Sequence, residues 1–232
     1  MKRPAGPFPL MVALGAIILA RVAGAQAQDA RAEGPIEIDK CQTISHPGSY
    51  KLVGNLTATT GDCLVITADA VTIDLAGFSI TSRTPSSGTG IVTPSPQQGI
   101  AVRNGSIFNL LNGVDLSGGS HIVEGLRIVG GFDRIGTRIK ADGIVKGNIV
   151  EGGGTGITAI GIVTGNSSSV SDLGMSIGRG STVIGNIATS NRIGIRVVCP
   201  SVVTGNVALG GLGGDPFLEG NGCTNENNVE RP

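Results

Sequence analysis

Aromatic residues are scarce in this chain. Among its 232 residues there is no Trp and one Tyr, and Phe, Trp and Tyr together make up 3%. Grooves that bind sugars commonly use aromatic faces, so a stacking platform of that kind has few residues to draw on. Charged residues are also few, at 15%, and they form no basic stripe. The composition therefore argues against nucleic acid as a partner.

Metal-ligating residues are equally few. The sequence has two His and four Cys, and no Cys-x-x-Cys pair. We therefore expect no bound metal and no cofactor. The two histidines, His46 and His121, follow Ser in turn-like segments with Pro-Gly or Gly-Gly nearby. We expect each to be structural or simply exposed.

No apolar run reaches the roughly 20 residues that a bilayer-spanning helix needs. The longest lies near residues 8–20, after Lys2 and Arg3, and is followed by Ala25-Gln26-Ala27. This order is typical of a secretory signal peptide. We expect residues 1–27 to be removed and the mature protein to be secreted or periplasmic, without a membrane span. An uncleaved membrane anchor is the alternative.

The mature chain, 28–232, would be slightly acidic. Lys2, Arg3 and Arg21 all lie in the leader, so 14 of the 17 basic residues remain beside 17 acidic residues. A chain of this length fits one domain. Nothing in the sequence indicates its oligomeric state.

Four cysteines in an exported chain are expected to pair. Three connectivities are possible. We predict Cys41–Cys63 and Cys199–Cys223, because each pairing closes a short loop and would staple one end of the molecule.

A Gly-Asn pair recurs through the C-terminal half at intervals of 18, 20 and 20 residues, and each Gly follows a Val by two positions. The pairs are Gly147-Asn148, Gly165-Asn166, Gly185-Asn186 and Gly205-Asn206. A period near 20 indicates a stacked solenoid. Abundant Gly and β-branched residues favour many short strands joined by tight turns.

These patterns predict an all-β fold, a single-stranded parallel β-helix (solenoid) of about seven rungs. We place the helix at residues 63–210, with an N-terminal cap region at 28–62 and a C-terminal cap or tail at 211–232. The Leu frame of leucine-rich repeats and the Gly-Gly-x-Gly-x-Asp motif of calcium-binding repeats are both missing. A sandwich would not need a constant phase of Gly-Asn.

The repeated Asn has a physical role in such a stack. Its amide can bond to its own copy one rung away and so form a ladder. We predict that Asn148, Asn166, Asn186 and Asn206 form a structural ladder of this kind and do not bind a ligand.

The chain resembles bacterial right-handed parallel β-helix repeat proteins of the pectin-lyase-like superfamily. The resemblance lies in the segment from Cys63 to Ile80 and in the repeated Gly-Ile-x-Val and Val-x-Gly-Asn phrases, and it covers about residues 36–228. It implies a right-handed helix. It also implies a function among polysaccharide lyases, glycoside hydrolases, epimerases and proteins without a known activity.

The triplet Arg138-Ile139-Lys140 is also present in polygalacturonases of that superfamily, but we carry no catalytic assignment over from it. The acidic motifs that accompany it there are missing, and hydrolysis needs two carboxylates. A lyase needs a base and a cation to hold a uronate carboxylate. The charged cluster that could supply them gives the catalytic candidates Asp115, Arg138 and Lys140, with Ca²⁺ considered only for a lyase.

The placement of these candidates rests on one alignment. Aligning the rungs on Gly113, Gly136, Gly156, Gly174 and Gly194 puts Asp115, Arg138 and Arg196 in one outward column. Arg138 and Lys140 would then flank an inward Ile139 and point into solvent together. An ordinary solvated face with an Asp115–Arg138 ion pair is the alternative.

Two functions follow. The first is a secreted, non-catalytic β-helix with an envelope, surface or weak glycan-binding role, for which the expected partner is a polysaccharide. The alternative is a polysaccharide lyase or epimerase acting on glycans that contain uronate. The missing acid pairs favour the first.

Overall fold

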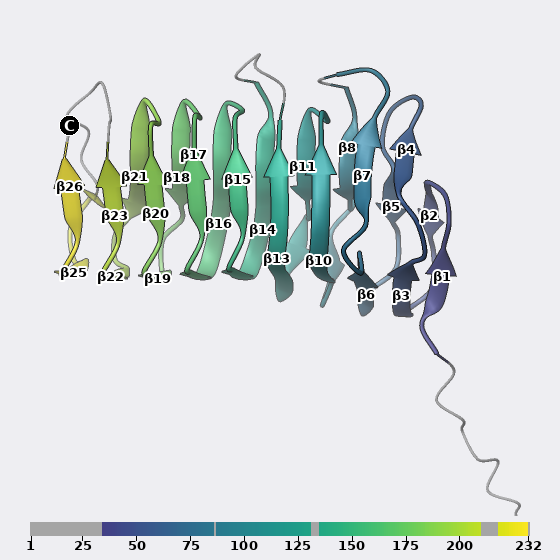
Figure 1. Cartoon of the computed structure of the whole chain (residues 1–232). Coiled ribbons are helices and arrows are strands. Elements are labelled where there is room, and N and C mark those ends of the chain that lie inside the picture. Colours follow the sequence, from purple (N-terminus) through teal and green to yellow (C-terminus); the bar gives the residue numbers. More distant parts are fainter. Residues whose placement is uncertain (1–33, 86, 131–134, 210–217, 232) are drawn as a thin grey trace, which may run out of the picture. The chain divides into compact units, whose positions relative to one another are not determined.

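The computed structural model describes residues 34–85, 87–130, 135–209 and 218–231. The predicted signal peptide, 1–27, lies outside these ranges. Within them the chain is all-β, without a helix, and its parallel strands stack into a β-solenoid of about eight turns (Figure 1). The predicted fold class is confirmed, and the number of turns is close to the seven expected. No helix in these ranges could cross a membrane.

The turns of the coil form three parallel ladders, here called faces 1, 2 and 3, and a full turn contributes a short strand or part of a longer strand to each. Face 1 runs along the lower edge of Figure 1, face 2 in front and face 3 behind. Face 1 holds β1 (Ile36–Ile38), β3 (Gly48–Leu52), β6 (Val71–Asp74), the first part of β10 (Ala101–Phe108), the first part of β13 (His121–Val129), the last part of β14 (Thr137–Lys146), the last part of β16 (Thr155–Thr164), β19 (Thr182–Ile184), β22 (Val202–Thr204) and β25 (Thr224–Glu226).

Faces 2 and 3 complete each turn. Face 2 holds β4 (Leu56–Ala58), β7 (Ser79–Ser82), the last parts of β10 and β13, β15 (Ile149–Glu151), β17 (Ser167–Ser169), β20 (Ile187–Thr189), β23 (Val207–Leu209) and β26 (Val229–Arg231). Face 3 holds β2 (Gln42–Ile44), β5 (Leu64–Ile66), β8 (Thr89–Val92), β11 (Asn112–Asp115), the first parts of β14 and β16, β18 (Leu173–Ile177), β21 (Ile193–Val198) and β24 (Leu218–Glu219). A separate pair, β9 (Gln97–Gln98) and β12 (Gly118–Gly119), lies between faces 3 and 1.

The interior is a narrow stack of aliphatic side chains. Alternation along each short strand turns one residue inward and its neighbours outward. On face 1 the inward residue is the Val that precedes the repeated Gly, and its copies in successive turns are all buried: Val123, Val145, Val163, Val183 and Val203. Strands β1 to β4, in the region predicted as a cap, join the same ladders.

The corner between faces 1 and 2 explains the repeated Gly. Gly147, Gly165, Gly185 and Gly205 all have φ between 61° and 65°, a left-handed conformation that favours Gly. In the last turn Asn227 takes this place with a φ of 54°. Asn tolerates that conformation better than most residues with a side chain.

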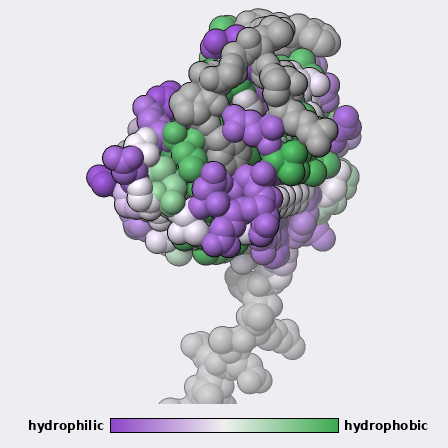
Figure 2. Space-filling view, turned by 90° about the vertical axis from the view of Figure 1, so that its left-hand side faces the viewer, coloured by the Kyte–Doolittle hydropathy of each residue, from purple (hydrophilic) through white to green (hydrophobic). Residues whose placement is uncertain are grey.

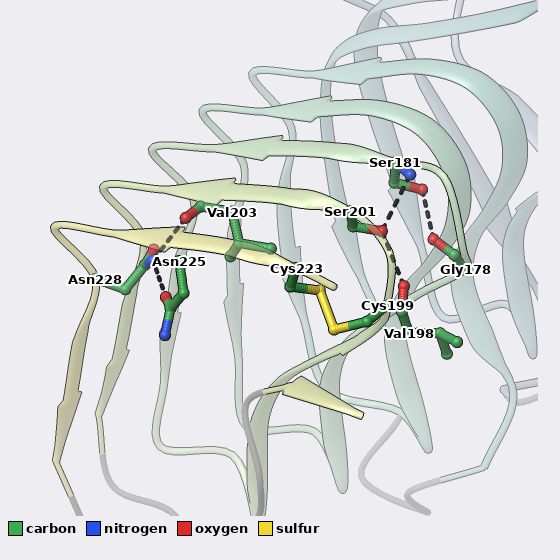
Figure 3. The surroundings of a disulfide bond; sticks show 9 residues. All are labelled: Gly178, Ser181, Val198, Cys199, Ser201, Val203, Cys223, Asn225 and Asn228. Carbon is green, nitrogen blue, oxygen red and sulfur yellow. Dashed lines mark hydrogen bonds between the residues drawn. A yellow bond between two sulfur atoms is a disulfide. The ribbon is translucent and has the colours of Figure 1, made fainter. Parts of the chain in front are cut away.

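Disulfides join Cys41 to Cys63 and Cys199 to Cys223, as predicted. Figure 3 shows the second bridge, which links the end of face 3 to the start of the last face 1 strand.

The last turn differs from those before it, because polar residues occupy its inward positions. Asn225 pairs with Val203 and Glu230 with Ala208, and both polar residues are exposed. Figure 2 looks onto this end and shows purple, hydrophilic residues gathered over its middle.

Candidate functional site

Arg138 does not lie on the outer surface, so its predicted place is wrong. Its side chain is buried, with 1% of the residue exposed. The guanidinium donates to the carbonyl oxygens of Leu110 (2.7 Å), Leu111 (2.8 Å), Ile135 (2.9 Å) and Gly152 (3.1 Å). These carbonyls belong to three successive corners between faces 2 and 3. Arg138 therefore links three turns of the coil.

The glycines around Arg138 make room for this side chain. A Cβ atom on Gly130 would lie 2.0 Å from the Arg138 Cζ atom, and one on Gly153 would lie 2.5 Å from its Nε atom. Any larger residue at either position would collide with the guanidinium. Because Gly130 and Gly153 have no side chains, they leave the space that the Arg138 side chain fills.

The pairing of the face 3 strands explains why Arg138 is buried and does not lie in the outward column. Strand pairing puts Arg138 in line with Gly113 before it and Gly156 after it, whereas Gly136 lies two residues earlier. In the other turns this position is a glycine whose Cβ, if present, would be directed into the core. These glycines are Gly90, Gly113, Gly156, Gly174 and Gly194. Aligning the turns on glycine identity therefore shifted the β14 turn by two residues.

With the register corrected, an outward polar column runs along face 3 in successive turns. Its members are Asp115, Lys140, Thr158, Ser176 and Arg196. Lys140, not Arg138, pairs with Asp115, at 3.2 Å between Nζ and Oδ1. At the other end Arg196 pairs with Glu219 at 2.6 Å.

A shallow groove of about 340 Å³ lies along this column. Lys140 and Asp142 line it on one turn, followed by Thr158 and Ser176 on the next two. The Asp142 carboxylate accepts the N–H of Ile160 at 3.0 Å. The residues that line the groove therefore carry three hydroxyls, those of Ser117, Thr158 and Ser176, and one ammonium group. The carboxylate of the groove, Asp142, already has a backbone donor.

Asp115, Arg138 and Lys140 consequently do not form one constellation. Asp115 and Lys140 share the outer column, and Arg138 lies inside the coil.

The corner between faces 3 and 1 holds a further polar side chain, that of His121, which the sequence assigned to a turn. His121 is the first residue of β13, and only 1% of it is exposed.

The burial of His121 determines its hydrogen bonding and lowers its pKa. Its Nδ1 atom accepts the N–H of Ile100 at 3.3 Å, and its Nε2 atom has no hydrogen-bond partner within the described ranges. Desolvation lowers the pKa of His121 from its ordinary value of 6.5, and the backbone of Ser117 and the charge of Asp142 partly offset this. The imidazole is therefore neutral at pH 7.

The Asn side chains form a buried ladder between faces 1 and 2. Each Nδ2 donates to the Oδ1 of the next copy at 2.9–3.0 Å, through Asn148, Asn166, Asn186, Asn206 and Asn228. Each Oδ1 also accepts the backbone N–H of the copy before it. The fifth member, Asn228, was missed because Asn227 stands where the other copies have Gly.

Within the described residues, no group of three or more His, Cys, Asp or Glu side chains is placed to hold a metal ion. Comparison with protein-family models, curated proteins and solved structures found none that matches this chain.

Proposed function

We propose that this protein is an exported, non-catalytic β-solenoid that binds glycans weakly at the cell envelope or surface. The observation that carries the proposal is the face 3 groove, with Lys140, Thr158 and Ser176 on successive turns. Strand copies repeat every 4.8 Å or so, close to the length of one sugar unit in an extended glycan. Hydroxyls and an ammonium at that spacing suit a polysaccharide laid along the coil axis.

The charged groups of the groove support binding without catalysis. Lys140 is paired with Asp115, and Asp142 accepts a backbone N–H. A lyase needs a cation to hold the uronate carboxylate. Lys140 is the single cation among the described residues that line the groove, and it is already paired with Asp115, which favours weak binding over catalysis.

Export is part of the proposal. Two disulfides fit an oxidising compartment, and the leader pattern at 1–27 supplies the signal. Membership of the pectin-lyase-like superfamily, with a right-handed coil, is proposed on the sequence phrases and the parallel solenoid alone.

Glycan binding is tested by titrating the purified protein with polygalacturonate, alginate and a neutral glucan. Binding should weaken at least threefold in Lys140→Ala. The matched control is Lys146→Ala on face 1, whose side chain is equally exposed (51% against 53%) and equally paired, with Glu124. Absence of binding to all three glycans, or equal loss in both variants, would reject the proposal.

Catalysis as a lyase or epimerase is the competing function, and it now depends on Lys140 with Asp115. It is tested by ultraviolet absorbance of unsaturated uronides, and by proton exchange from solvent at the sugar ring, with and without Ca²⁺. Turnover that is lost in Lys140→Ala and kept in Lys146→Ala would establish an enzyme.

A further inference from the structure

Face 1 carries an exposed aliphatic stripe on its C-terminal half. Ile122, Ile144 and Ile162 stack in one outward column, which continues through Thr182 to Val202. Where Thr182 interrupts the column, Ile184 on the same strand turns outward. Ile162, Ile184 and Val202 are 46%, 42% and 43% exposed. Five consecutive turns thus present an aliphatic side chain on this face.

Face 2 also exposes aliphatic residues, but its stripe is broken. Ile149 and Ile187 are 55% and 45% exposed. The turn between them is β17, whose sequence is Ser-Ser-Ser. The face 2 column continues through Val207 to Val229, so each face has one polar interruption, and on face 1 the outward Ile184 lies on the interrupted turn. Exposed apolar surfaces of this kind mark interaction sites.

The outward column beside the face 1 stripe carries opposite charges at equal distances from the β16 turn. This column reads Arg103, Glu124, Lys146, Thr164, Ile184, Thr204 and Glu226 in successive turns. Arg103 and Glu226 lie three turns on either side of the β16 turn. Each is about 14 Å from it along the coil axis.

We propose that two copies of this chain pair through face 1 in antiparallel orientation, about a two-fold axis that crosses the coil at β16. Ile162 then meets Ile162 of the other copy, and Ile122 meets Val202. Arg103 of each copy lies opposite Glu226 of the other. No two like charges face each other in this arrangement, and the aliphatic centre is covered.

The orientation follows from the charges. A two-fold axis along the coil would bring the charged column of one copy onto the aliphatic column of the other. Glu124 and Lys146 would then be buried against isoleucines, and burying charge without a new partner is costly. An axis across the coil brings each column onto its own reverse, so that Arg103 meets Glu226. Glu124 then meets Thr204, and only Lys146, which keeps its partner Glu124, meets an isoleucine, Ile184.

The contact is small, so the dimer should be weak. Seven turns extend for roughly 30 Å, and the strands of face 1 are short. This is less than the standard interface area of stable complexes. We therefore expect association that depends on protein concentration and weakens with salt.

The test is sedimentation velocity of the purified protein over a concentration series. Ile162→Lys should raise the dimer dissociation constant at least tenfold. Ile149→Lys on face 2 is the matched control, because Ile149 is as exposed, and it should leave association unchanged. A protein that stays monomeric up to millimolar concentration would overturn the proposal, as would equal disruption by both variants.

A charge swap tests the orientation. Arg103→Glu and Glu226→Arg should each weaken the dimer, and the double variant should recover at least half of the lost affinity. Thermal melts establish that the variants are folded, since Arg103 also pairs with Asp74 at 3.2 Å. Failure of the double variant to recover would overturn the antiparallel arrangement.

Discussion

The side chain of Arg138 occupies an inward position that other turns leave to Gly. On this one turn a guanidinium lies where the other turns have no side chain, and it donates hydrogen bonds to four carbonyl oxygens. A planar group with five N–H donors suits this role, and the single ammonium of Lys does not. The residue that looked most catalytic in the sequence serves to hold three corners together.

We predict that Arg138→Ala destabilises the fold by about 3 kcal/mol or more, because it leaves a cavity and removes the donors of four carbonyls. Arg138→Lys should recover only part of this loss. Chemical denaturation monitored by circular dichroism measures both. If Arg138→Ala unfolds at the same denaturant concentration as the wild type, the stapling role is wrong.

His121 makes stability depend on pH. Its pKa is lower in the folded state than the ordinary 6.5, because burial disfavours the charged ring. As pH falls below about 6.5, the unfolded chain takes up the proton first, and the free energy of unfolding decreases. Above pH 7 the ring is neutral in both states and this contribution is constant.

We predict that the unfolding free energy falls between pH 7 and pH 5, and that His121→Asn flattens this part of the profile. An Asn amide oxygen can accept the Ile100 N–H as Nδ1 does, but it does not titrate. Denaturant melts at each pH provide the measurement. An unchanged slope in the variant would show that carboxylates, not His121, cause the fall.

At the scale of elements, the strands are short, and side-chain columns that run from turn to turn fix the register in which the strands pair. A strand of three residues, such as β19, β20 or β22, offers little register information of its own. The Asn ladder supplies it, since a slip of one residue would remove every amide from its partner. The sequence predicted this ladder because Gly and Asn recur in phase.

We predict that Asn186→Ala costs about 2–3 kcal/mol, because it breaks bonds to Asn166, Asn206 and the Val163 carbonyl in a buried site. Asn228→Ala should cost less, since Asn228 lies at the end of the ladder and is half-buried. Thermal melts of the two variants compare them. Equal losses would mean that the ladder does not act through burial.

The register of face 3 shows where sequence reasoning stopped. Five turns share an inward Gly, so aligning on Gly identifies this column except at Arg138, which takes the place of Gly. A side chain that enters the core through space left by Gly130 and Gly153 leaves no periodic signal. The groove was out of reach for the same reason, because it depends on Lys140 replacing Arg138 in the outer column.

At the scale of the molecule, each turn contacts only its neighbours, so stability is a sum of local terms. The two disulfides lie in different end regions, Cys41–Cys63 near the N-terminal turns and Cys199–Cys223 near the last. Fold class and disulfide pairing were accessible from the sequence, because both follow from a period and from loop length.

We predict that the double variant Cys199→Ser/Cys223→Ser loses about 3 kcal/mol of stability. Amide exchange should increase in β24 to β26 and stay unchanged in β3 to β6, because the solenoid transmits little between distant turns. Hydrogen exchange with mass spectrometry resolves these regions. Uniformly faster exchange would mean that the coil unfolds as one unit.

The polar last turn limits the length of the solenoid. Stacked parallel strands with aligned amide ladders are also the geometry of amyloid fibrils, in which every added chain extends the same interior. Asn225 and Glu230 stand where another layer would require aliphatic side chains. Templated growth from this end would bury an amide and a carboxylate, so the rod is self-limiting.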